Sequence, residues 1–262
     1  MKSVKKVLSL VLALSVVVFC LAGCGNKEET KGTDAKDETK ATVLKIGTNA
    51  EFPPFEFVDA ANGVIDEFAG IDLEIAKEIA AKAGMTPEIN NMDFDGLLIA
   101  LSNGQVDMVI AGMTVTEERA QAVDFSEPYY TATQVMIVPN DSDIQSAKDL
   151  EGKKIGVIDG YTGQTCVEEL GYDFDGYKKG ADSVLDLVNG KLDVVVIDSA
   201  TAEKFIADNS DLKIVEDPEA FADEQYAIAV KKGNKELLDT VNAAIKELKD
   251  SGKIAEISAK YN

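Results

Sequence analysis

The chain contains no histidine, and Arg119 is the only arginine among its 26 basic residues. Without histidine, histidine-based catalytic triads and most zinc sites are excluded. Positive charge is scarce as a whole, because 47 acidic side chains leave a net charge of −21. A nucleic-acid partner is therefore not expected, since phosphate binding needs a basic surface. We also expect no metal and no cofactor.

Long apolar runs are also scarce, apart from residues 7–22 near the N-terminus. This run follows a basic start and is too short to span a bilayer, which is typical of a secretory signal. It ends in Leu21-Ala22-Gly23-Cys24, which resembles the lipobox of bacterial lipoproteins; the alternative is an ordinary signal peptide with a chance cysteine. We expect residues 1–23 to be a lipoprotein signal peptide and Cys24 to be lipidated. The protein would then be anchored to the cell membrane on its extracytoplasmic side.

Cysteine is rare too, with three residues in the whole chain. Cys20 would leave with the signal peptide and Cys24 would carry lipid, so Cys166 has no partner for an internal disulfide. We expect Cys166 to be a small buried hydrophobe. Residues 24–42 are rich in polar and charged side chains and cannot bury enough apolar surface to offset their ordering entropy. They are predicted to form a flexible tether, with no transmembrane segment after it.

From Val43 onward, short β-branched runs alternate with helical patterns, which predicts an α/β fold with mainly parallel sheets. The remaining stretch of about 220 residues suits two small lobes better than one core. The expected strands are 43–47, 106–111, 154–158 and 194–197, and the expected helices include 71–82 and 94–102.

One sequence pattern occurs twice. Residues 101–110 read LSNGQVDMVI and residues 187–196 read LVNGKLDVVV. In both, Asn-Gly is suited to end a helix through a left-handed residue, and a buried parallel strand follows. Convergence on good local chemistry is one interpretation; two lobes of similar design is the other. Ligands of open α/β sheets collect beyond the carboxyl ends of strands, so the two strand ends would face each other across a cleft.

Arg119 is the first candidate for ligand binding. It follows Thr116, a predicted N-cap, and a cation in the first turn of a helix opposes the helix dipole. Bidentate recognition of a carboxylate would explain an arginine at this position, because lysine cannot reproduce it. The alternative is a surface arginine paired with Glu117 or Glu118.

Other candidates lie near strand ends. Asp198 follows an apolar strand and suits an ammonium group, although an N-cap for the next helix is an equally good interpretation. Thr162 and Gly163 open a predicted helix, whose amides favour a carboxylate. Phe52 and Phe94 could stack on a ligand or belong to the core.

Four segments carry a family resemblance: Gly70-Ile71-Asp72-Leu73-Glu74-Ile75, Met92-Asp93-Phe94-Asp95-Gly96, Ala111-Gly112-Met113-Thr114-Val115-Thr116-Glu117-Glu118-Arg119 and Asp124-Phe125-Ser126-Glu127-Pro128-Tyr129-Tyr130. Together they resemble the polar amino-acid-binding proteins of ABC importers, solute-binding family 3. The resemblance implies a two-lobed, type II periplasmic-binding-protein fold, each lobe a mainly parallel sheet flanked by helices. The implied boundaries are 43–130 and 228–262 for lobe 1, 135–224 for lobe 2, and 131–134 and 225–227 for two crossing hinge strands.

The same resemblance implies roles for individual residues. Arg119 would hold the α-carboxylate of the ligand, helped by the Thr114 and Thr162 hydroxyls and the Gly163 amide. The Gly112 carbonyl and the Asp198 carboxylate would hold the α-ammonium. Phe52 and Phe94 would sandwich the side chain of the ligand.

The sequence departs from the family pattern around the expected side-chain pocket. Asn49 stands where many relatives have aspartate, and Gln164 where some have aspartate. Glu51 and Asp159 are candidates for restoring negative charge there, or else lie at the solvent rim. If both face the cleft, they favour a cationic or hydrogen-bonding ligand side chain over aspartate or glutamate.

The resemblance implies a monomeric protein without catalytic residues, which captures a free polar amino acid by hinge closure and delivers it to the permease subunits of an ABC importer. One alternative is an enzyme on the same scaffold, similar to cyclohexadienyl dehydratase, for which Glu51 or Asp159 would be the general acid. Another is the binding subunit of an amino-acid sensor.

Overall fold

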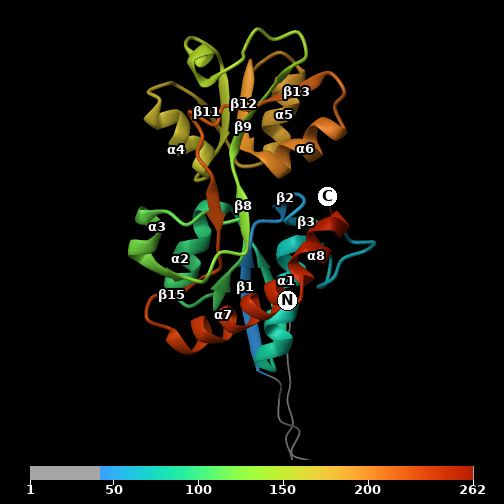
Figure 1. Cartoon of the computed structure of the whole chain (residues 1–262), viewed down its shortest axis with the longest axis vertical. Coiled ribbons are helices and arrows are strands. Elements are labelled where there is room, and N and C mark those ends of the chain that lie inside the picture. The colour runs from blue at the N-terminus through green and yellow to red at the C-terminus, as the bar shows by residue number, and fades with distance from the viewer. Residues whose placement is uncertain (1–41, 262) are drawn as a thin grey trace, which may run out of the picture. The chain divides into compact units, whose positions relative to one another are not determined.

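The computed structural model describes residues 42–261 (Figure 1). The predicted signal peptide, the lipidation site Cys24 and nearly all of the tether lie outside these residues. Within 42–261, the helices are all too short or too polar to cross a membrane. The described part of the chain forms two α/β lobes, each built around a five-stranded sheet.

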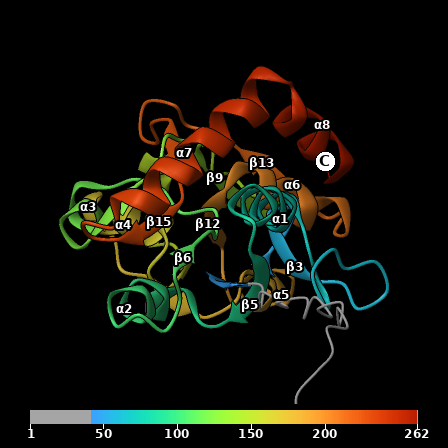
Figure 2. The ribbon, with the colours of Figure 1, turned by 90° about the horizontal axis from the view of Figure 1, so that it is seen from below.

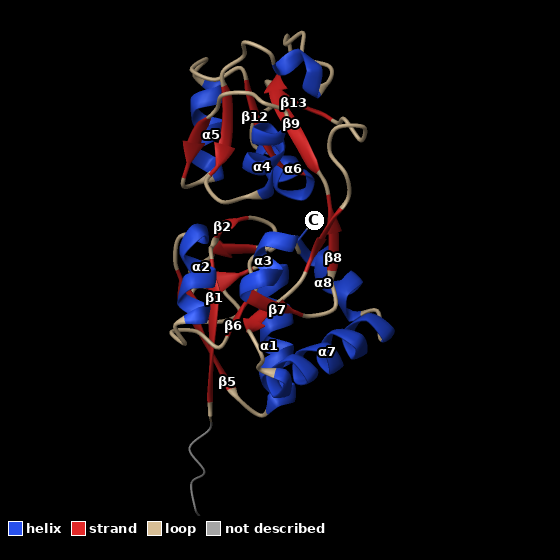
Figure 3. Ribbon diagram, turned by 90° about the vertical axis from the view of Figure 1, so that its left-hand side faces the viewer, coloured by secondary structure: helices blue, strands red, loops and turns tan. Residues whose placement is uncertain are grey.

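The first lobe is built from two separate stretches of the chain. Its strands are β1 (Val43–Thr48), β2 (Glu51–Phe52), β3 (Glu56–Val58), β4 (Phe68–Ala69), β5 (Thr86–Asn91), β6 (Met108–Val109), β7 (Val123–Phe125) and β15 (Ala229–Lys231). Its helices are α1 (Ile71–Ala83), the 3₁₀ turn η1 (Phe94–Gly96), α2 (Leu97–Ser102), α3 (Glu117–Ala122), α7 (Lys235–Asp250) and α8 (Lys253–Tyr261). The sheet order is β5-β1-β6-β15-β7, and a small sheet β2-β3-β4 lies beside it. The C-terminal helices α7 and α8 pack against α1 (Figures 2 and 3).

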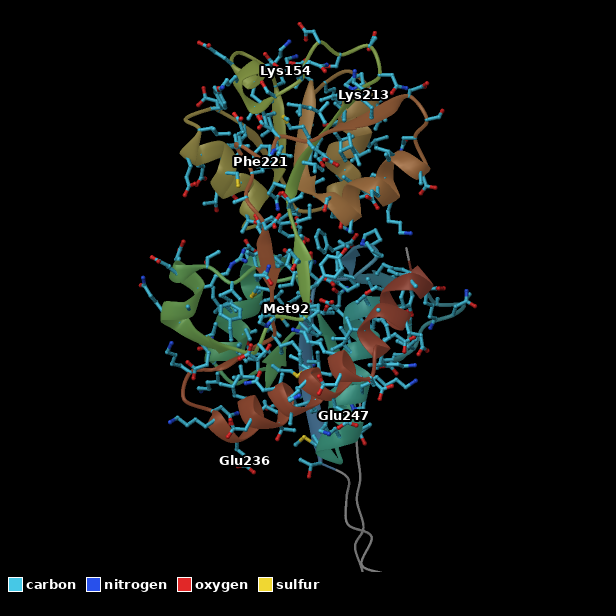
Figure 4. The ribbon with its side chains drawn as sticks, in the orientation of Figure 1. Met92, Lys154, Lys213, Phe221, Glu236 and Glu247 are labelled. Carbon is cyan, nitrogen blue, oxygen red and sulfur yellow. The ribbon has the colours of Figure 1, made fainter. Side chains whose placement is uncertain are left out.

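The second lobe comes from the middle of the chain. Its strands are β9 (Gln134–Pro139), β10 (Ile155–Ile158), β11 (Asp175–Tyr177), β12 (Val194–Asp198) and β13 (Leu212–Val215). Its helices are the 3₁₀ turn η2 (Ala147–Leu150), α4 (Thr162–Glu169), α5 (Gly180–Val188) and α6 (Ser199–Ala207). The sheet order is β11-β10-β12-β9-β13. Phe221 is buried in the core of this lobe (Figure 4).

The two sheets correspond strand for strand. In the first, β5, β1 and β6 run parallel and β15 is antiparallel to its neighbours β6 and β7. In the second, β11, β10 and β12 run parallel and β9 is antiparallel to β12 and β13. In each sheet, one strand therefore runs antiparallel to the other four. This common design confirms the predicted fold class of two mainly parallel α/β lobes.

The repeated Asn-Gly pattern occupies the same place in both lobes. Gly104 follows α2 with φ +72°, and Gly190 follows α5 with φ +69°, so glycine supplies the left-handed residue each time. The central strands β6 and β12 come next in the sequence. The predicted strand 106–111 is shorter than expected, since only Met108–Val109 is paired as β6. The predicted helix 94–102 begins as η1 and continues as α2.

Both faces of the first sheet are covered. Met108 packs in the same apolar cluster as Ile75 of α1, whereas the next residue, Val109, packs with Leu101 of α2. Side chains alternate between faces along a strand, so β6 contributes to two layers of core at once. A strand buried on both faces accounts for the uninterrupted apolar run MVIA.

Two strands outside the lobe sheets join the lobes. β8 (Tyr130–Ala132) pairs with β14 (Glu224–Tyr226) as a separate antiparallel two-stranded sheet (Figure 3). The chain enters the second lobe through β8 and returns to the first through β14. These strands overlap the segments predicted as hinge strands.

Candidate ligand-binding site

A small pocket with a free volume of about 10 Å³ lies where the two lobes meet. It is lined by Phe52, Phe94, Ala111, Gly112, Thr114, Arg119, Tyr161, Thr162 and Asp198. A volume of this size holds about one water molecule, so the side chains of the two lobes fill most of the space between them. Seven of its nine lining residues are among the predicted site residues, and they come from both lobes.

The Arg119 side chain crosses from the first lobe to the second. The start of α3 fixes the backbone of Arg119, because the Thr116 hydroxyl caps the helix by accepting the Arg119 N–H at 3.2 Å. Arg119 Nη1 donates to the Thr114 carbonyl and Nη2 to the Gly160 carbonyl, each at 2.8 Å. The guanidinium lies 5.2 Å from the centre of the Phe94 ring. Among the described residues no ion pair joins Arg119 to Glu117 or Glu118, which disfavours the alternative of a surface pair.

Asp198 ends β12 and is buried, with 3% of its surface exposed. It occupies the N-cap position of α6, but its side chain makes no cap hydrogen bond. Instead its carboxylate accepts the hydroxyl of Tyr226, which comes from β14. Burial and, next, the nearby Glu224 carboxylate raise the pKa of Asp198 to about 7, although hydrogen bonds from Tyr226 and Gln134 oppose the shift. A buried carboxylate that resists ionisation would gain most from a cationic partner.

The backbone at Gly112 is fixed from behind. Its φ is +51°, and a Cβ at this position would lie 2.5 Å from the Phe52 ring, so no other residue fits. The Gly112 N–H donates to Asp72 Oδ2 at 2.7 Å, and the Tyr129 hydroxyl donates to the same oxygen at 2.7 Å. Burial raises the pKa of Asp72 to about 6. Burial and, next, the neighbouring Asp72 raise the pKa of Glu56 well above its usual value, which favours the protonated form of Glu56.

Tyr161 fills the space between the two predicted sandwich residues. Its ring centre lies 5.3 Å from that of Phe52, edge to face, and 4.5 Å from that of Phe94. Its hydroxyl donates to Asn49 Oδ1 at 3.0 Å across the lobes. Asn49 therefore lies behind the pocket and does not line it. Sequence reasoning did not assign Tyr161 a role; its position directly before Thr162 was the available signal.

Glu51 and Asp159 lie at the rim and not among the pocket-lining residues. Lys179 Nζ is 2.7 Å from Glu51 Oε1, and Lys178 Nζ is 3.4 Å from Asp159 Oδ2. The idea that these two acids restore negative charge to the pocket is thus corrected: each is paired with a lysine and partly exposed. Of the two interpretations weighed for them, the structure shows the solvent rim.

The threonine hydroxyls and Gly163 have different surroundings. Thr114 Oγ1 donates to Glu224 Oε2 at 2.6 Å, and Thr162 Oγ1 donates to the same oxygen at 2.7 Å. Glu224 was not predicted as a site residue. Gly163 is buried without lining the pocket, and a Cβ there would lie 2.8 Å from Gln134 Oε1, so close packing of α4 requires glycine.

Comparison with known proteins shows the family. Residues 44–262 match the family described as bacterial extracellular solute-binding proteins, family 3. The chain belongs to this family. Among curated relatives of this solute-binding protein, the arginine-binding extracellular protein ArtP of Bacillus subtilis (strain 168) is 35% identical over 256 residues, 96% of each chain. A probable histidine-binding protein of Neisseria gonorrhoeae is 34% identical over 256 residues, 95% of this chain and 93% of the other.

Solved structures of similar proteins agree with the fold. The substrate-binding protein of an amino acid ABC transporter is 43% identical with a TM-score of 0.79, covering 84% of this chain and 98% of that chain. The arginine-, lysine- and histidine-binding protein ArtJ of Geobacillus stearothermophilus is 36% identical with a TM-score of 0.78, covering 84% and 94%. The two-lobed type II fold expected for this solute-binding protein is thereby confirmed.

Proposed function

We propose that this solute-binding protein captures a free polar L-amino acid between its lobes and delivers it to an ABC importer. One observation carries the proposal: Arg119 of the first lobe and Asp198 of the second line the same small pocket. A zwitterion needs a cation for its carboxylate and an anion for its ammonium. The two groups are supplied from opposite lobes, so one small ligand would hold the lobes together.

The remaining lining residues suit the rest of the ligand. The Thr114 and Thr162 hydroxyls are donors that a carboxylate can use. Phe52, Phe94 and Tyr161 form apolar walls that exclude water and strengthen electrostatic contacts. ArtP is named for arginine and ArtJ for arginine, lysine and histidine. We therefore favour a cationic or hydrogen-bonding ligand side chain over aspartate or glutamate.

Hinge closure accompanies binding in this proposal. β8 and β14 are short strands between two separately folded lobes, which is the arrangement in which hinge motion is absorbed.

Delivery takes place outside the cytoplasm, with the protein anchored as a monomer through Cys24. For the anchor, Cys24→Ser is expected to yield a released protein or an uncleaved precursor. A processed Cys24→Ser protein that still fractionates with membranes would overturn the anchor alone.

A thermal-shift screen against the common L-amino acids and cystine tests the binding function. A ligand present at 100 times its Kd adds about 2.7 kcal/mol of stability, which is easily detected. We expect an amino acid with a cationic or an uncharged hydrogen-bonding side chain to give the largest shift. A screen without any shift, or one led by leucine or glutamate, would contradict the proposal.

The dehydratase alternative is tested by incubation with prephenate or arogenate. It requires a general acid at the ligand, and the two acids considered for that role, Glu51 and Asp159, lie outside the pocket lining in ion pairs with lysines. We expect both compounds to remain unchanged. Their turnover by the purified protein would replace the binding function with an enzymatic one.

A further inference from the structure

The side chain of Glu224 connects both lobes from the hinge. Glu224 begins β14, where it pairs with Ala132 of β8. Its Oε2 accepts the hydroxyl of Thr114 at 2.6 Å and that of Thr162 at 2.7 Å. Thr114 belongs to the first lobe and Thr162 opens α4 of the second, so one carboxylate oxygen holds a donor from each lobe.

These two hydroxyls are the donors that suit the α-carboxylate of an amino acid. A threonine hydroxyl has a single hydrogen, so it donates to one acceptor at a time. Thr162 Oγ1 also accepts the side-chain amide of Gln134 at 3.1 Å, which leaves its hydrogen directed to Glu224. A ligand carboxylate that uses either hydroxyl therefore has to take it from Glu224.

The charge of Glu224 acts on the same two groups as the ligand would. Among the neighbouring charges, Glu224 is the strongest in keeping the Arg119 guanidinium protonated against the effect of burial on its pKa. It is also the neighbouring charge that most disfavours ionisation of Asp198, whose pKa is raised. Glu224 thus acts on Arg119 as the carboxylate of the ligand would. Its charge also disfavours ionised Asp198, the anion that would hold the ligand ammonium.

We propose that Glu224 is an internal competitor for the ligand carboxylate. By accepting the Thr114 and Thr162 hydroxyls, Glu224 holds the two lobes together and weakens amino-acid binding. Binding is then an exchange of one carboxylate for another at the same donors. The inference rests on the proposed amino-acid-binding function and adds a residue that sets affinity. It also gives the protein a way to release its ligand, since the donors have an alternative partner within the chain.

The test is calorimetric titration of L-arginine, with L-glutamine as a second probe, into wild type, Glu224→Ala and Glu224→Gln. Because the alanine variant leaves both hydroxyls without their internal acceptor, we expect its Kd to fall about tenfold, equal to about 1.4 kcal/mol. The glutamine variant keeps an acceptor oxygen without the charge, so its Kd should fall by less. Asp223→Ala is the matched control, because it removes the same charge from the exposed neighbouring residue; its Kd should stay at the wild-type value.

The protein without added amino acid provides a second readout. Loss of the interlobe contact in Glu224→Ala should increase the radius of gyration in small-angle scattering and lower the thermal midpoint. Both quantities should change less in Glu224→Gln, which keeps an acceptor oxygen, and should not change in Asp223→Ala. These measurements remain informative if wild type binds neither probe, a result that counts against the proposed function and not against the internal contact.

Three results would overturn the inference. Weaker or unchanged binding by Glu224→Ala would show that Glu224 does not compete with the ligand. Equal tightening by Asp223→Ala would reduce the effect to net charge. Unchanged scattering and midpoint in both Glu224 variants would show that the carboxylate does not hold the lobes together.

Discussion

Replacing Arg119 by lysine should weaken amino-acid binding strongly while leaving the protein folded. In the structure the guanidinium uses two nitrogens, Nη1 and Nη2, to reach carbonyls of different lobes at 2.8 Å, and lies over the Phe94 ring. An ammonium is a single point charge that cannot keep this orientation and also grip both oxygens of a carboxylate.

The magnitude follows from the number of contacts that lysine cannot make. A hydrogen bond to a charged group contributes roughly 1.5–3 kcal/mol. Because lysine preserves the charge and one such bond, we expect a loss of about 2–3 kcal/mol, or roughly 30- to 150-fold in Kd. Arg119→Ala, which also removes the charge, should lose more.

Calorimetric titration with the best amino acid, beside thermal unfolding, measures both halves of this prediction. Glu118→Ala is a suitable control, because Glu118 is an exposed neighbour in the same turn of α3; its affinity should match wild type. A lysine variant within threefold of wild type in Kd would refute the role of Arg119 in holding the ligand.

Three further predictions concern buried groups behind and within the pocket. Because the pKa of Asp72 is raised from 3.8 to about 6, the folded protein binds its proton more tightly than the unfolded chain. The stability of wild type relative to Asp72→Asn should therefore fall by about 3 kcal/mol as the pH rises from 3 to 7 and then level off. Urea unfolding at several pH values would contradict this if the stability of wild type relative to Asp72→Asn rose with pH. Asp198 has a pKa of about 7 and should lose its proton to bind an ammonium. Calorimetric titrations in buffers of different ionisation enthalpy should therefore show about half a proton released on binding at pH 7. The Kd should fall about tenfold as the pH rises from 6 to 8. Proton uptake would contradict that role. Gly112→Ala, which places a methyl group 2.5 Å from the Phe52 ring at a positive φ, should cost about 2–3 kcal/mol in urea unfolding and remove binding; an alanine variant with wild-type stability would show that the contact relaxes freely.

Residues whose roles depend on local chain chemistry were accessible from the sequence. Arg119 stands out in the sequence because a lone arginine opposes the dipole of the helix that Thr116 caps, and in the structure Thr116 caps α3 while Arg119 reaches the second lobe. The Asn-Gly pairs predicted where α2 and α5 end, because glycine in the left-handed conformation ends a helix in any context. Such features need only a few neighbouring residues.

Roles that arise where the lobes meet were not accessible in the same way. The sequence left Asp198 equally suited to cap α6 or to bind an ammonium, and the choice depends on the hydroxyl of Tyr226, which arrives on β14. Glu224 and Tyr161 gain their contacts from opposite lobes. For Glu51, the sequence could not show that Lys179 of the other lobe would neutralise it. In each case the partner is distant in the chain and is fixed only by tertiary packing.

If charges from both lobes hold one zwitterion, a ligand with either charge blocked should bind poorly, and calorimetric titration with such ligands measures this. The best-binding amino acid would be compared with its α-carboxamide, which cannot use Arg119, and its N-acetyl derivative, which cannot use Asp198. Because losing one partner of a buried charged pair costs about 3–5 kcal/mol, each block should raise Kd by at least about 100-fold. Binding of either derivative within tenfold of the parent amino acid would contradict the claim.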